Sequence, residues 1–289
     1  MRYLIPSLFL LLSLGLASCG KENSNGNGQT TIAAKTMLNV AYGGSAAQVM
    51  DLYLPANRTA AGTKVIFMIH GGAWSAGDKA DFSAFVDTLK RRMPSYAIVN
   101  INYRLASGSN NIFPTQENDV KTAVDFIYSK RIEYNISDKF VMMGASAGGH
   151  LALLHSYKHL SPVKIKAVVD FFGPSDMVKM YNQPALIVPP AFISSLMGGT
   201  PSQQPLLYQQ SSPVNFIDAQ SGVPTIIFQG GLDLLVSPPQ SEAVRNKLNQ
   251  AGIINQYVFY PLGGHGDWDA ATFADAFNKI QAFLTIHVP

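Results

Sequence analysis

The sequence is poor in cysteine and in charge. Cys19 is the only cysteine among 289 residues, so the chain cannot form an internal disulfide. Charged residues make up 13% of the chain, the net charge is +3 at pH 7, and lysine and arginine form no dense run. Because nucleic acid is held by a concentrated basic surface, we expect no nucleic-acid partner.

The chain also lacks an apolar run long enough to cross a bilayer comfortably. Residues 1–18 have a basic start, a short apolar stretch and small residues at the end, which is typical of an export signal. The letters Leu16-Ala17-Ser18-Cys19 resemble a bacterial lipobox, in which the cysteine is lipidated and becomes the first mature residue. We therefore predict a lipoprotein signal peptide and a membrane anchor at Cys19 in an exported, periplasmic or cell-surface protein. The alternative is a plain signal peptide with an incidental cysteine.

A polar, glycine-rich segment follows the cysteine. Residues 19–31 contain too few apolar side chains to fold and are predicted to be a flexible tether. Residues 32–289 show no repeat of fixed period and no second boundary between domains. With 47% hydrophobic residues in the chain, this part is long enough to bury one large core, and we predict one catalytic domain.

Short apolar runs alternate with longer segments of helical period throughout this domain, which is typical of an α/β fold with a mostly parallel sheet. Eight strands are expected at residues 37–41, 49–54, 64–70, 97–103, 139–143, 167–172, 225–229 and 256–260. The first two are predicted to form an antiparallel hairpin. Helices are expected at residues 82–92, 115–128, 147–158, 239–251 and 270–285. The long segment 175–223 is expected to shape a substrate pocket, together with Trp74, Tyr181 and Phe192.

The letters Gly144-Ala-Ser146-Ala-Gly148 lie between a predicted strand and a predicted helix. Small residues on both sides of a serine allow a tight, strained turn that exposes the hydroxyl. The start of the following helix offers its positive dipole end and the amide of Ala147 to a developing oxyanion. Ser146 is therefore the predicted nucleophile, although a turn of small residues alone would fit the same letters.

A serine hydroxyl needs a base to remove its proton. His265 lies in the glycine-rich loop Pro261-Leu-Gly-Gly-His-Gly266, after the last predicted strand, and is the predicted base. His150 follows Ser146 on the same helix and is expected to pack rather than to accept the proton. The other histidines are set aside: His155 and His159 are expected to face solvent, His70 to shape its loop, and His287 is near the end of the chain.

The base in turn needs a carboxylate to orient it. Asp233 follows a predicted strand, and the carboxyl ends of parallel strands gather at one edge of the sheet, where sites form. Asp233 is therefore the predicted acid, with Asp170 and Asp176 as rivals. A further aspartate, Asp267, is so close to the predicted base in sequence that it is expected to order the loop.

Two consecutive glycines follow the third predicted strand in His70-Gly-Gly-Ala-Trp74. Such a loop can aim backbone N–H groups into a pocket, so Gly71, Gly72 and Ala73 are candidates for the oxyanion hole, with Ala147 as a further donor. The chain order of this loop, the serine, the aspartate and the histidine is the order of an α/β-hydrolase.

Together these motifs resemble the α/β-hydrolase esterase/lipase family, in particular its bifunctional feruloyl/acetyl xylan esterase-like group. The resemblance extends from Tyr42 to His265 and rests on the segments YGG, MDLYLP, HGGAW, NYRL, FP…D, GASAGGHLA, GGLD and GGHG. It implies triad roles for Ser146, Asp233 and His265, and a structural ion pair between Arg104 and Asp119. Methionines at residues 68, 142 and 143 are expected in the core.

The resemblance implies hydrolysis of carboxylic esters, of small molecules or glycans, through an acyl-enzyme and without a metal or organic cofactor. The sequence departs from the family in two places. Gln229 stands where many relatives have histidine, and Ala73 stands where lipases often have a third glycine, which leaves open which amides donate. Three alternatives remain: a kynurenine formamidase-like amidase, a serine peptidase of the prolyl-oligopeptidase kind, and a non-catalytic surface-binding lipoprotein. The sequence does not indicate the oligomeric state.

Overall fold

The structure is a computed structural model and describes residues 31–289. The predicted signal peptide and Cys19 lie outside the described residues. Residues Ile32–Pro289 form one compact unit. Among residues 31–289 we find no helix whose length and hydropathy would let it span a bilayer.

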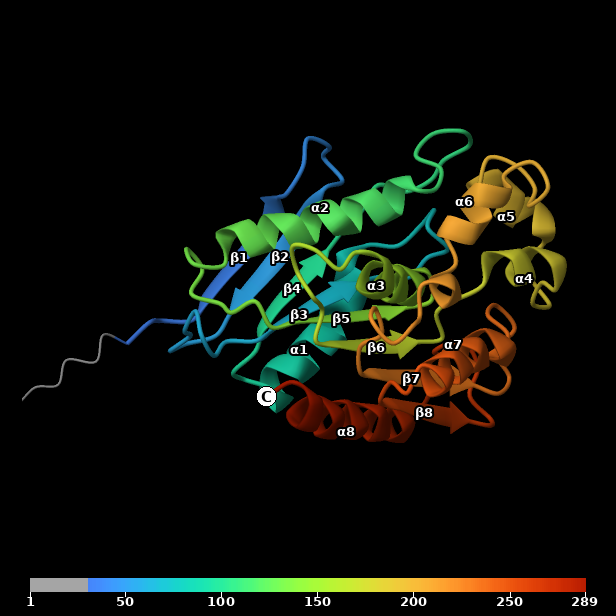
Figure 1. The fold of residues 1–289 in the computed structure, drawn as a ribbon. Helices are drawn as coiled ribbons and strands as arrows, with labels where there is room; N and C mark the ends of the chain where they lie inside the picture. Colours follow the sequence, from blue (N-terminus) through green and yellow to red (C-terminus); the bar gives the residue numbers. More distant parts are fainter. Residues whose placement is uncertain (1–30) are drawn as a thin grey trace, which may run out of the picture. The chain divides into compact units, whose positions relative to one another are not determined.

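The centre of the unit is an eight-stranded sheet in the order β1-β2-β4-β3-β5-β6-β7-β8 (Figure 1). β2 pairs antiparallel with both β1 and β4, and all pairs from β4 to β8 are parallel. Parallel strands place their carboxyl ends at one edge, so the loops that follow β3, β5, β7 and β8 meet there. The strands are Lys35–Ala41 (β1), Val49–Leu54 (β2), Val65–Ile69 (β3), Ala97–Ile101 (β4), Phe140–Ala145 (β5), Ala167–Phe171 (β6), Thr225–Gly230 (β7) and Asn255–Tyr260 (β8).

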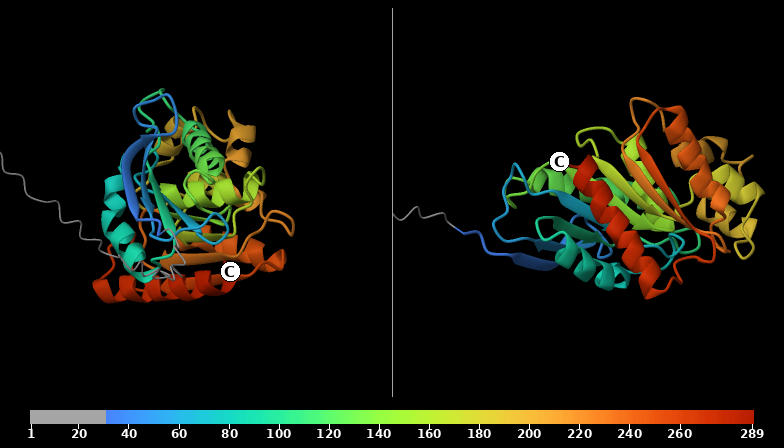
Figure 2. Two further views of the ribbon diagram at one scale, coloured as in Figure 1. Left: turned by 90° about the vertical axis from the view of Figure 1, so that its left-hand side faces the viewer. Right: turned by 90° about the horizontal axis from the view of Figure 1, so that it is seen from below.

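Helices cover both faces of the sheet (Figure 2). Buried residues of α2, α3 and α7 share one core, and those of α1 and α8 share the other. The short helices α4, α5 and α6 gather at the end of the sheet toward which β6, β7 and β8 point (Figure 1). The α-helices are Ser83–Arg92 (α1), Thr115–Lys130 (α2), Ala147–Lys158 (α3), Met177–Asn182 (α4), Pro190–Leu196 (α5), Pro205–Gln210 (α6), Pro238–Gln250 (α7) and Ala270–His287 (α8).

Strand β3 shows why the central strands are largely apolar. Val65, Phe67 and Ile69 face the core under α3, whereas Ile66 and Met68 face the core under α1 and α8. Alternate side chains of a strand point to opposite faces, so cover on both sides favours apolar residues at successive positions, as in β3. The methionines of β3 and β5 are buried in these cores, as predicted.

The predicted fold is confirmed: the sheet is mostly parallel, helices lie on both faces, and the fold is that of the α/β-hydrolases. All eight predicted strands and all five predicted helices are present with shifts of one or two residues at their ends, and β1 and β2 form the expected hairpin. The segment 175–223 was predicted without helices, yet it contains α4, α5, α6 and the 3-10 helix Pro213–Asn215. Helices of six or seven residues are too short to produce a readable apolar period.

Candidate active site

Ser146 occupies the sharp turn between β5 and α3. Its backbone angles are φ 56° and ψ −123°, a conformation that costs free energy for a residue with a side chain. Two hydrogen bonds hold the turn: the Ser146 amide donates to the Phe171 carbonyl at 2.8 Å, and the His150 amide donates to the Ser146 carbonyl at 2.9 Å. The turn thereby keeps the serine side chain at the edge of the sheet.

The two glycines of this motif are required by close backbone contacts. A β-carbon on Gly144 would lie 2.2 Å from the Gly148 carbonyl oxygen, and one on Gly148 would lie 1.9 Å from the Ile69 carbonyl oxygen. Both contacts are with backbone atoms, which cannot rotate away as a side chain can. Only glycine therefore lets α3 begin so close to β3 and β5.

Asp233 and His265 come from the loops that follow β7 and β8. Their side chains meet, with His265 Nδ1 2.7 Å from Asp233 Oδ2. Asp233 Oδ1 accepts from the amides of Leu235 at 2.9 Å and Val236 at 2.8 Å, and the carboxylate is fully shielded from solvent. Because a carboxylate accepts, the imidazole donates through Nδ1 and leaves Nε2 free to accept a proton.

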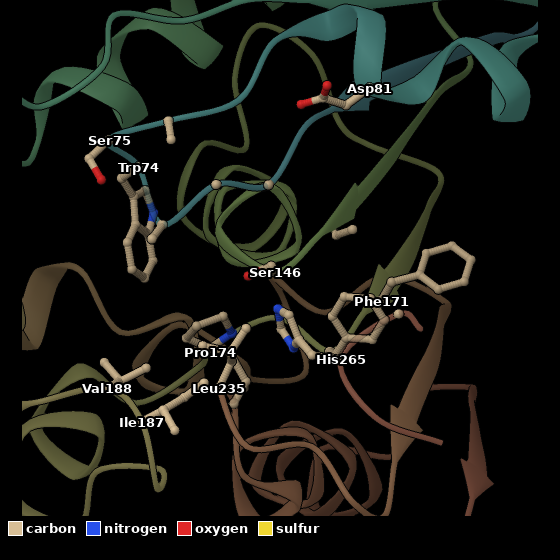
Figure 3. A pocket seen from close by; sticks show the side chains of 18 of the residues that line it. Trp74, Ser75, Asp81, Ser146, Phe171, Pro174, Ile187, Val188, Leu235 and His265 are labelled. Carbon is tan, nitrogen blue, oxygen red and sulfur yellow. The ribbon is translucent and has the colours of Figure 1, made fainter. Parts of the chain in front are cut away.

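Ser146 and His265 line one pocket of about 680 Å³. Figure 3 shows the His265 imidazole beside Ser146, with Phe171 on one side and Pro174 and Leu235 on the other. The pocket has an aromatic lobe formed by Phe82, Phe85, Phe171, Phe172 and Phe273. The rest of the wall includes Trp74, Met180, Ile187, Val188, Phe192 and Leu235.

The loop after β3 exposes backbone N–H groups to this pocket. Gly72, Ala73 and Trp74 all have positive φ, at 102°, 52° and 59°, and the amides of Ser75 and Ala76 fold back onto the Gly72 carbonyl. Within residues 31–289, the amides of Gly71, Gly72, Ala73 and Ala147 donate to no protein acceptor. Since these residues line or adjoin the pocket, their N–H groups can bind an oxyanion there.

His70 shapes this loop, as predicted. Its Nδ1 donates to the Gly71 carbonyl at 2.7 Å, and its ring stacks on Tyr103 with 4.3 Å between the ring centroids. The Tyr103 hydroxyl donates to the His70 carbonyl at 3.0 Å. Burial lowers the pKa of His70, so the ring stays neutral in this position.

The rival carboxylates do not contact His265. Asp170 lies on the face of β6 that packs against α3, where its carboxyl accepts from the Gly173 amide at 3.0 Å. It is completely buried, and this burial raises its pKa to about 7. Asp176 caps α4 by accepting from the Lys179 amide. Of the four aspartates considered, Asp233 is the one within hydrogen-bonding distance of His265.

Among the histidines of α3 and of the residue that follows it, one was predicted correctly and two were predicted wrongly. His150 is a packing residue: its Nδ1 accepts from Trp74 Nε1 at 3.1 Å, and its Nε2 lies 2.7 Å from the Ser211 carbonyl. The prediction that His155 and His159 face solvent is wrong. His155 is buried, which lowers its pKa to about 3, and His159 bonds Glu117 of α2 at 2.8 Å. Because α2 covers the outer side of α3, this helix has little exposed surface.

The predicted ion pair and two of the three predicted pocket aromatics are also confirmed. Arg104 Nη2 lies 2.6 Å from Asp119 Oδ1, and Asp119 is fully buried. Trp74 and Phe192 line the pocket, whereas Tyr181 is not part of its lining and packs edge-on against Tyr208. Sequence reasoning missed the aromatic lobe, because its phenylalanines come from four places that no local pattern links: the 3-10 helix Lys79–Phe82, α1, the end of β6 and α8.

Among residues 31–289, no group of three or more histidine, cysteine, aspartate or glutamate side chains could hold a metal ion. The polar groups that line the pocket include the Ser146 and Ser75 hydroxyls, the His265 imidazole, the exposed Asp81 carboxylate and backbone amides.

A comparison with known protein families gives a match to the BD-FAE family over residues 50–248, more than half of the chain. The protein belongs to the BD-FAE family. Its curated relatives include a probable carboxylic ester hydrolase, LipM, of Mycobacterium tuberculosis, which is 27% identical over 68% of this chain and 47% of its own length. Dipeptidyl peptidase family member 6 of Caenorhabditis elegans is 26% identical over 76% of this chain and 30% of its own length. This BD-FAE member thus spans about a third to a half of those relatives.

Solved structures resemble this BD-FAE member over most of its length. A truncated form of a carbohydrate esterase from gut microbiota is 29% identical, with a TM-score of 0.72 over 87% of this chain and 96% of the other. A bifunctional GH43-CE protein of Bacteroides eggerthii is 27% identical, with a TM-score of 0.72 over 86% of this chain and 38% of the other. Curated relatives and structural neighbours thus include ester hydrolases.

Proposed function

We propose that this protein is a serine hydrolase that cleaves carboxylic esters through an acyl-enzyme. The observation that carries the proposal is the 2.7 Å contact between His265 Nδ1 and Asp233 Oδ2, together with the position of His265 in the wall of the same pocket as Ser146. A nucleophile, a base and a group that orients the base are the three parts that this chemistry needs. The ester hydrolases among the relatives and structural neighbours support the same reaction class.

The first step in this mechanism is attack by Ser146 on the ester carbonyl. Because His265 donates through Nδ1 to Asp233, its Nε2 accepts the serine proton as the bond to the carbonyl carbon forms. The resulting imidazolium then donates this proton to the leaving alcohol. In the second step His265 takes a proton from water, which attacks the acyl carbonyl, and then returns this proton to the Ser146 oxygen as the acid is released.

The charge that develops on the carbonyl oxygen is assigned to the amides of Ala147 and of the loop Gly71 to Ala73. Within residues 31–289 these amides donate to no backbone acceptor, so they can donate to the oxyanion without first breaking another hydrogen bond. The left-handed φ of Ala73 explains how the loop presents its amides without a third glycine.

For the substrate we propose short-acyl or feruloyl esters of carbohydrates. The two carbohydrate esterases among the solved structures support this class. The aromatic lobe next to Ser146 offers apolar surface for an acyl group, in particular for a planar ring that can stack on phenylalanine. The sugar would then extend from the mouth of the pocket, where the lining includes the exposed Asp81.

Amide cleavage is the second candidate, because two curated relatives are dipeptidyl peptidases at 26% and 27% identity. The same triad can attack an amide carbonyl, since the chemistry differs mainly in the leaving group.

A substrate panel tests these assignments. We expect hydrolysis of nitrophenyl acetate, acetylated xylan and methyl ferulate, with kcat/KM for the preferred ester at least about 100-fold above that for N-formylkynurenine or a dipeptidyl nitroanilide. Released acid and released amine are measured separately by chromatography. A preference for the formyl amide or the nitroanilide would overturn the ester assignment, and hydrolysis of none of them would favour a binding protein.

We also propose that the protein is exported and held at a membrane through lipidated Cys19. The support is the lipobox-like sequence at residues 16–19. Mass spectrometry of the N-terminal peptide from the native host is expected to show a chain that begins at an acylated Cys19. An unmodified Cys19 or an uncleaved N terminus would contradict this proposal.

A further inference from the structure

A buried glutamine lies behind the carboxylate that contacts His265. Gln229, near the end of β7, has no exposed surface, and its Nε2 lies 3.3 Å from Asp233 Oδ2. This is the same oxygen that His265 Nδ1 contacts at 2.7 Å. Asp233 Oδ1 is already occupied by two backbone amides, so the carboxylate has donors on both oxygens.

The surroundings of Gln229 determine which end of its amide faces Asp233. Besides the carboxylate, Nε2 has two carbonyl acceptors, Gly230 O at 3.0 Å and Val236 O at 3.2 Å. The reversed amide would place its oxygen against three acceptors, which would repel it. On the other side, the buried Ser241 hydroxyl of α7 donates to Gln229 Oε1 at 2.7 Å. The amide can therefore donate toward Asp233 in one orientation only.

We infer that Gln229 is a positioning residue, held by Ser241, that keeps the Asp233 carboxylate directed at His265. This inference rests on the proposed function. The chain of donors runs from the Ser241 hydroxyl to the Gln229 amide and from that amide to Asp233. A neutral amide supplies the donor without a charge of its own, so the aspartate remains the one charge beside the histidine in this network. Asp233 sits on a loop, and a fixed donor from a strand restricts its rotation.

Gln229→Met tests the inference, because methionine is of similar length and has no N–H donor. We expect kcat for nitrophenyl acetate to fall about 10- to 100-fold, because small errors in catalytic geometry cost rates of this size. KM is expected to change less than about twofold, since the ground-state ester does not contact Asp233. A kcat within about twofold of wild type in a folded variant would overturn the inference.

Gln240→Met is the matched control. Gln240 is also a buried glutamine, and its Oε1 accepts from the amides of Ser175 and Asp176 at 2.8 Å, so the same substitution removes buried hydrogen bonds away from Asp233. We expect Gln240→Met to lose about as much thermal stability as Gln229→Met and to keep kcat within about threefold of wild type. An equal fall of kcat in both variants would mean that general loosening is the cause, and would overturn the inference.

Ser241→Ala tests the inference a second time, and its effect in the wild-type background can be measured even where Gln229→Met does not fold. In the wild-type background we expect a fall of kcat of about 3- to 10-fold with KM unchanged, and in the Gln229→Met background no further fall, because the serine acts through the glutamine. Full activity of Ser241→Ala would overturn the role of this serine as the holder of Gln229. Wild-type protein without esterase activity that depends on Ser146 would instead overturn the proposed function itself.

Discussion

Replacing Ser146 with alanine is expected to lower kcat for nitrophenyl acetate about a millionfold, close to the background of the remaining pocket. The loss is this large because no other hydroxyl stands at the turn between β5 and α3, so covalent catalysis ends. Stability is expected to stay near that of wild type, since the change removes one half-buried hydroxyl and leaves the backbone hydrogen bonds of the turn in place. The measurements are steady-state kinetics and labelling with a fluorophosphonate probe, mapped by mass spectrometry.

Ser156→Ala is the matched control for this experiment. Ser156 is a buried serine on the same helix, and its hydroxyl donates to the Ala152 carbonyl at 2.7 Å. It is far along α3 from the turn, so activity and labelling are expected to persist in this variant. If Ser146→Ala still reacts with the probe and keeps its activity, the nucleophile is another residue and the mechanism proposed above is wrong.

Asp233→Asn is expected to lower kcat about ten-thousandfold. The oxygen of the new amide is expected to stay on the Oδ1 side, where the amides of Leu235 and Val236 donate to it. The NH2 group then faces His265 Nδ1, which must become an acceptor, and the ring proton moves to Nε2. A protonated Nε2 cannot take the proton of Ser146. Steady-state kinetics measures the loss, and circular dichroism checks that the fold is retained.

Asp170→Asn separates this effect from the general loss of an aspartate near the sheet edge. Burial already raises the pKa of Asp170 to about 7, so a neutral amide resembles the protonated form of this carboxyl. Its oxygen can still accept from the Gly173 amide. We expect kcat within about threefold of wild type. A large loss in Asp170→Asn together with little loss in Asp233→Asn would transfer the acid role to Asp170.

The elements that the sequence predicted best are those whose signal is local. The central strands are largely apolar because both of their faces are covered, and this leaves short apolar runs in the sequence. Gly144 and Gly148 indicated a turn without room for side chains. The structure agrees, because a β-carbon on either glycine would collide with a backbone carbonyl. Ser146, Asp233 and His265 could be named in advance because they follow strands, and strand ends share one edge of the sheet.

The expectations that failed concern residues whose surroundings come from elsewhere in the chain. His155 and His159 are polar residues, which favours exposure to solvent. Helix α2 nevertheless packs against this side of α3. The sequence of α3 alone does not indicate that another helix covers it. The aromatic lobe could not be assembled in advance for the same reason, since the 3-10 helix Lys79–Phe82, α1, the end of β6 and α8 bring its rings together. In the sequence, Gln229 differs from the histidine of many relatives, but this difference did not indicate its contact with Asp233.

The sequence alone predicted the α/β fold, the order of the motifs and the strained serine turn. These features could be predicted because strands, turns and capped helices depend on neighbours along the chain. Only folding in three dimensions selected Asp233 over Asp170 as the partner of His265, and placed Gln229 and Ser241 behind it. The physical reason is that a hydrogen bond depends on distance and direction to within a few tenths of an ångström. Chain order specifies which residues follow one another, whereas packing decides which atoms meet.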